Sequence, residues 1–179
     1  MPLPKQAVSF RQLRSEGLTK LKILALCSSL RLFPTPFKGI YYVPLEEERK
    51  GAFIENPLKI LSQAVALFLG SNEFYFSCRT AQEALGLNWQ PSGEVHIVNP
   101  KLSRRISLKE KIELSQMRGT WRSRKIAKLL SFYGNEIIFH RGEVAGAKTK
   151  QTPYGRFALR SQITADRKRF KEKHLRGLG

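Results

Sequence analysis

The chain has 179 residues and a net charge of +18, because 32 Lys and Arg stand against 14 Asp and Glu. Hydrophobic residues make up 41% of it, which is enough for a packed core and excludes a wholly disordered chain. The longest unbroken apolar run, residues 64–69, is far shorter than the roughly 20 residues that span a bilayer, so we expect no membrane partner. A surplus of positive charge this large predicts a polyanionic partner such as DNA or RNA.

Thiols and carboxylates are scarce in this chain. The two cysteines, Cys27 and Cys78, form no CxxC pair and are typical of reduced thiols in a cytoplasmic protein. Asp166 is the only aspartate, whereas metal-dependent nucleases gather two or more carboxylates around the ion. The three histidines are scattered without HxxxH spacing, so we expect no zinc site. We therefore predict a protein without catalytic residues, metal or cofactor.

Residues 8–45 have the pattern of a winged helix-turn-helix. A short helix ends at Gly17, a second helix begins after Thr19, and a strand follows at 37–43. Helix, turn, helix and basic β-element is the order of that motif, in which the second helix lies in the major groove. A small α/β core element with solvated lysines has the same local pattern. The cations on or beside these elements are the predicted DNA contacts: Lys20, Lys22, Arg31 and Lys38.

The charged stretch 46–51 reads as a solvated linker and as the domain boundary. We expect a winged-helix DNA-binding domain over 1–50 and a basic α/β domain over 51–179. After the boundary, the sequence predicts a helix that opens at Asn56-Pro57, a strand at 74–76 followed by a helix through Leu85, and an alternating strand at 94–99. The expected fold class is α+β, with an N-terminal winged helix-turn-helix, a mixed α/β C-terminal domain and a basic C-terminal helix.

Most of the positive charge lies in residues 101–179, with 21 basic and 6 acidic residues against 11 and 8 in residues 1–100. A helix after Thr120 carries cations opposite its apolar face, which suits contact with phosphates but also describes any solvated surface helix. Residues 157–179 predict a basic tail helix with few apolar positions, part of which we expect to be disordered without a partner. The predicted contacts to nucleic acid or to a protein partner are Arg104, Arg105, Arg122, Arg124, Lys125, Lys128, Arg167, Lys168 and Arg169.

Three stretches together resemble a known family. GIYYVP (39–44) closes the basic first segment, a helix follows Asn56-Pro57, and FYFSCRTAQEALGL (74–87) precedes the strand EVHIV. This order is similar to the AbiEi-like antitoxin and transcriptional-regulator family of type IV toxin–antitoxin systems, over roughly residues 8–100. The resemblance implies a DNA-binding N-terminal domain, repression of the protein's own operon, and neutralisation of a nucleotidyltransferase-like toxin. Only two helices fit before the wing, where the family usually has three.

Two classes of function remain open at this stage. The first is a DNA-binding regulator that represses transcription at an operator and counteracts a toxin, and the GIYYVP stretch favours it. The second is a structural RNA-binding component of a ribonucleoprotein. A nucleic-acid-processing enzyme is a third class, which the shortage of carboxylates disfavours.

Overall fold

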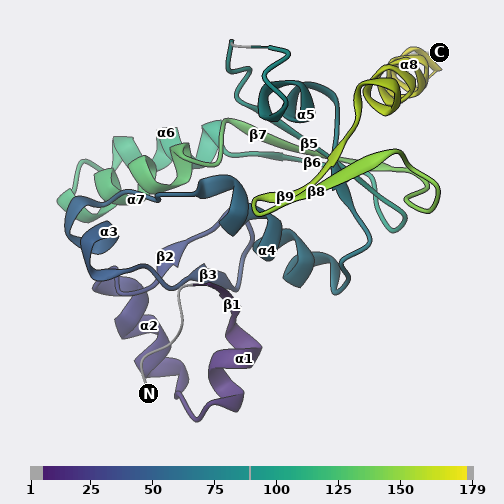
Figure 1. The fold of residues 1–179 in the computed structure, drawn as a ribbon. Helices are drawn as coiled ribbons and strands as arrows, with labels where there is room; N and C mark the ends of the chain where they lie inside the picture. Colours follow the sequence, from purple (N-terminus) through teal and green to yellow (C-terminus); the bar gives the residue numbers. More distant parts are fainter. Residues whose placement is uncertain (1–5, 89, 177–179) are drawn as a thin grey trace. The chain divides into compact units, whose positions relative to one another are not determined.

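The fold is mixed α+β, which confirms the predicted class at this level. The computed structural model describes residues 6–88 and 90–176, and within them the chain forms eight helices and two sheets (Figure 1). Two compact units are formed, one from residues 1–71 and 107–133, the other from 72–106 and 134–179. We expected one boundary after residue 50. The chain instead enters the second unit twice, because segment 107–133 packs with the first.

A three-stranded sheet and two short helices open the first unit. Thr19 caps the second helix, since its side chain accepts a hydrogen bond from the Lys22 backbone N–H at 3.2 Å. β1 (Ala7–Ser9) and the two helices pack around an apolar core that includes Val8, Leu13 and Ile23. The sheet is antiparallel, in the order β1-β3-β2. In chain order the elements are β1 (Ala7–Ser9), α1 (Phe10–Ser15), α2 (Lys20–Ser28), β2 (Phe33–Pro34) and β3 (Ile40–Tyr42).

Four more helices complete the first unit. The helix predicted after Asn56-Pro57 is confirmed: it begins at Pro57, ends before Gly70 and packs its apolar face on β1 and β3. The predicted linker at 46–51 is wrong, because these residues form a helix in which Glu48 is buried. These helices are α3 (Glu46–Gly51), α4 (Pro57–Leu69), α6 (Lys109–Met117) and α7 (Trp121–Ser131), of which α6 contacts α7 and α7 contacts β2.

The second unit is built on a six-stranded sheet in the order β6-β7-β5-β4-β9-β8. Its central strands β5 and β7 run parallel over six residues each, and α5 and α8 contact each other. The strands are β4 (Tyr75–Phe76), β5 (Glu94–Asn99), β6 (Arg104–Ser107), β7 (Glu136–Arg141), β8 (Thr149–Thr152) and β9 (Gly155–Ala158). The helices are α5 (Cys78–Ala84) and α8 (Arg160–Arg176). The last three residues of the predicted tail helix, 177–179, lie outside the described residues.

The parallel register of β5 and β7 places two histidines on one face of the sheet. His96 pairs with Ile138, and His140 pairs with Val98. Since side chains alternate between faces along a strand, residues 96 and 98 share a face with their partners 138 and 140. Both imidazoles therefore project from the middle of the sheet on the same side.

Candidate functional site

The four predicted DNA contacts all lie in the first unit, and all four are exposed. Lys20 and Lys22 are on α2, which contains no acidic residue. Ile23 anchors this helix in the core with none of its surface exposed, whereas Leu21 on the same helix is 78% exposed. Arg31 follows α2, and Lys38 lies in the turn between β2 and β3. The first turn of α2 therefore exposes two cations, Lys20 and Lys22, and the apolar side chain of Leu21 to solvent.

The predicted contacts on α7 divide into two kinds. Arg122 and Arg124 are exposed. Lys125 is half-buried, with its Nζ 3.9 Å from the centre of the Trp121 ring, a cation–π contact. Lys128 Nζ donates to the backbone carbonyl of Gly51 at 3.2 Å, which ties α7 to the end of α3. The first two side chains are therefore available to a partner, while the other two also contact groups of their own unit.

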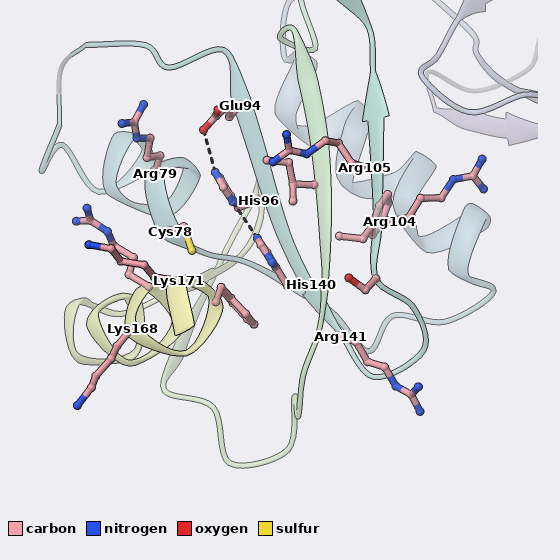
Figure 2. Close-up of a pocket in the computed structure, with 15 residues that line it drawn as sticks. Cys78, Arg79, Glu94, His96, Arg104, Arg105, His140, Arg141, Lys168 and Lys171 are labelled. Atoms are coloured by element: carbon pink, nitrogen blue, oxygen red, sulfur yellow. Dashed lines mark hydrogen bonds and ion pairs between the residues drawn. The ribbon is translucent and has the colours of Figure 1, made fainter. Parts of the chain in front are cut away.

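The second unit holds an open pocket of about 1120 Å³. Its walls come from α5, β5, β6, β7 and α8, and seven of its fifteen lining residues are Lys or Arg, against a single Glu. Figure 2 shows Arg79 and Lys168 on one side of the pocket and Arg104 and Arg105 on the other. A hollow with this excess of positive charge suits phosphate or another polyanion. The seven cations are Arg79, Arg104, Arg105, Arg141, Arg167, Lys168 and Lys171.

Four of these cations were predicted from the sequence, and the structure brings them together: Arg104, Arg105, Arg167 and Lys168. The predicted contact Arg169 is exposed but does not line the pocket. The other three lining cations, Arg79, Arg141 and Lys171, were missed. Arg79 is the second residue of α5 and Arg141 is the last residue of β7. Neither of these two lies in a basic run along the sequence, so only the fold reveals that they converge.

Two imidazoles and a thiol lie together in the middle of the pocket (Figure 2). His96 Nδ1 is 2.9 Å from His140 Nε2, and the His96 Nε2 atom is 3.3 Å from Glu94 Oε2. The Cys78 sulfur and the nearest ring nitrogens of both histidines are within 4.8 Å of one another. The His140 ring also stacks on Phe170, with 4.0 Å between ring centres. Residues from two strands and two helices thus fix the three groups.

Burial governs the protonation of His96 and Cys78. It lowers the pKa of His96, against the opposing hydrogen bond and charge of Glu94, and it raises the pKa of the Cys78 thiol to about 11. At neutral pH the His96 ring and the Cys78 thiol are therefore both neutral. Cys78 also has a left-handed backbone, with φ of +50°, a conformation that a non-glycine residue keeps only where its surroundings impose it.

Although His96 and His140 are far apart in the sequence, the fold brings them together, and their rings stack with 5.3 Å between their centres. Both lie in short, mostly apolar stretches, EVHIV (94–98) and EIIFH (136–140). That pattern predicts the strands, but pairing and register depend on contacts far apart in the chain. The third histidine, His174, lies outside the described side chains.

Comparison of the chain with family models, curated proteins and solved structures finds no match. Within residues 6–88 and 90–176, no helix combines the length and the apolar character needed to cross a bilayer.

Proposed function

We propose that this protein binds duplex DNA through its first unit and acts as a transcriptional regulator of the antitoxin type that the sequence resemblance implies. The observation that carries the proposal is the succession β1-α1-α2-β2-β3 with the sheet order β1-β3-β2 and exposed cations along it. Two helices joined by a tight turn and followed by a basic β-hairpin are the parts from which a winged helix-turn-helix is made.

In this proposal α2 is the helix that enters the major groove. Its Lys20 and Lys22 side chains are free to reach phosphates or guanine edges, and the exposed Leu21 can contact a thymine methyl group. Lys38, in the turn between β2 and β3, has the position from which a wing would contact the DNA backbone. Base contacts from α2 would give sequence preference, while the wing and Arg31 would fix the register.

The cationic pocket of the second unit adds affinity for a polyanion in this scheme, and the protein acts by binding rather than by a chemical step. Cations that bind phosphate equally in ground and transition states give affinity and no rate enhancement. The same pocket favours a second candidate function, the binding of structured RNA. Its cations would contact RNA phosphates, and such contacts do not require a helix inserted into a major groove. Counteraction of a nucleotidyltransferase-like toxin remains the further role that the resemblance implies.

Two matched double variants test the DNA-binding proposal. One is Lys20→Ala with Lys22→Ala, and the other is Arg122→Ala with Arg124→Ala; each removes two exposed cations from a helix of the first unit. Binding is measured on the duplex upstream of the protein's own reading frame and on a random duplex. We expect the first variant to reduce the ratio of the two affinities about tenfold or more, and the second to leave that ratio unchanged.

If both variants lost affinity equally for both duplexes, sequence recognition by α2 would be contradicted. Tighter binding of structured RNA than of either duplex would replace this proposal with the second candidate.

A further inference from the structure

We propose that Cys78, His96 and His140 form a binding site for Zn²⁺ or a similar borderline divalent metal, with one coordination position facing the cationic pocket. The sulfur and ring nitrogen atoms of these residues lie within 4.8 Å of one another. In a tetrahedral zinc site, with bonds of about 2.0–2.3 Å, neighbouring ligand atoms are about 3.3–3.6 Å apart. Small side-chain rotations therefore suffice to bring the three atoms onto one ion.

The orientation of the two imidazoles supports this site. His96 Nδ1 and His140 Nε2 point at each other across 2.9 Å, so in the metal-free protein one nitrogen carries a proton and the other accepts it. For both nitrogens to bind a metal, the proton between them must move, through solvent, to the remote nitrogen of the same ring, so that both imidazoles stay neutral, and the Cys78 thiol must release its proton to solvent.

The surroundings of the ligands resemble the supporting contacts of metal sites. Glu94 Oε2 lies 3.3 Å from His96 Nε2, and a carboxylate on the remote ring nitrogen typically orients a metal-binding histidine. Phe170 stacks on His140 and fixes the plane of its ring. The left-handed backbone of Cys78 holds the thiol at the start of α5, where it is 6% exposed.

The donor set selects the class of metal. One thiol and two imidazoles suit zinc and its neighbours, whereas Mg²⁺ and Ca²⁺ require oxygen ligands. Three protein ligands leave a fourth position, as in zinc sites that bind water or a further ligand. Seven Lys and Arg line the pocket around that position, so we expect it to accept an anionic oxygen such as that of a phosphate. This site lies in the second unit and does not depend on DNA binding by α2.

Cobalt titration of the full-length, untagged, metal-free protein tests the site. We expect one Co²⁺ per chain, with the visible absorption of tetrahedral cobalt and a thiolate-to-cobalt charge-transfer band, both lost on addition of Zn²⁺. Cys78→Ser should lose the charge-transfer band. Glu94→Gln should keep the band and weaken the affinity about 10- to 100-fold, because it removes an orienting contact and no ligand. Cys27→Ser is the matched control, since Cys27 lies in the first unit, and should behave as the unaltered protein.

Three results would overturn the proposal. They are absence of tetrahedral cobalt absorption in the unaltered protein, a charge-transfer band that survives in Cys78→Ser, and a band lost in Cys27→Ser. Should Cys78→Ser fail to fold, His96→Gln and His140→Gln test the same site, because both histidines are only half-buried. Each must lose tetrahedral cobalt binding while its circular dichroism without metal matches that of the unaltered protein.

Discussion

Glu48 is a charged residue that the first unit buries almost completely, with 2% of its surface exposed. The Tyr42 hydroxyl donates to its Oε2, and the backbone N–H groups of Leu45 and Glu55 donate to its two oxygens at 2.9 and 3.0 Å. Burial, reinforced by this hydrogen bond and charge, raises the pKa of Tyr42 above its ordinary value. One carboxylate thus joins β3, the start of α3 and the segment before α4.

We predict that Glu48→Ala lowers the free energy of unfolding by about 3 kcal/mol, because it leaves a buried hydroxyl and two amides without this acceptor, and each buried unsatisfied group costs about 1–3 kcal/mol. Urea denaturation followed by circular dichroism measures the loss. Glu47→Ala is the matched control on the same helix, since Glu47 is exposed, and it should change stability by less than about 0.5 kcal/mol. Equal effects of the two substitutions would show that the Glu48 contacts contribute nothing net.

At the scale of elements, α8 is held to its sheet by a polar network rather than by a broad apolar face. Asp166, 2% exposed, accepts hydrogen bonds from Ser77 Oγ at 2.6 Å, from the Tyr75 hydroxyl at 3.1 Å and from Gln162 Nε2 at 2.9 Å. The only aspartate of the chain therefore links the basic helix to β4 and to the residue before α5. Ile163 adds a buried apolar contact.

We predict that Asp166→Ala loosens α8, because three donors lose their common acceptor. The backbone amides of residues 160–171 should exchange hydrogen at least about tenfold faster, as a local opening free energy reduced by roughly 1.4 kcal/mol or more requires. Hydrogen exchange followed by mass spectrometry measures this directly.

Thr164→Ala is the control on the same helix. Thr164 is exposed, and its hydroxyl donates to the carbonyl of Arg160 within α8. Unchanged exchange in Asp166→Ala, or equally accelerated exchange in the control, would argue that the network does not hold the helix.

Local signals in the sequence predicted several elements well and their assembly poorly. Asn56-Pro57 predicted the start of α4, and the alternation at 94–99 predicted β5, because caps and periodicity act within a few residues. The burial of Glu48 could not be predicted, since three adjacent glutamates look solvated until Tyr42 is known to face one of them. The return of 107–133 to the first unit and the pairing of His96 with His140 depend on contacts between segments far apart in the chain, which no local pattern encodes.

Over the whole molecule, the two units carry their positive charge in different ways. The first unit exposes Lys20, Lys22 and Arg31 singly on or beside a short helix. The second concentrates seven cations around one pocket. A net charge of +18 distributed in this manner predicts contact with several phosphates at once.

We therefore predict a steep dependence of nucleic-acid affinity on salt. If six phosphates of a duplex are neutralised, the logarithm of the association constant should fall by about 5 for each tenfold rise in salt, because each contact releases close to one condensed counterion.

Arg104→Ala with Lys168→Ala removes two exposed cations of the pocket and should reduce the slope by about 2 if the pocket contacts the backbone. The matched control, Lys148→Ala with Lys150→Ala, removes two exposed cations of the same unit that do not line the pocket and should leave the slope unchanged. An unchanged slope in the pocket variant would assign the phosphate contacts to the first unit alone. A slope near zero in the unaltered protein would exclude nucleic acid as its partner, since eighteen excess positive charges cannot bind a polyanion without releasing its counterions.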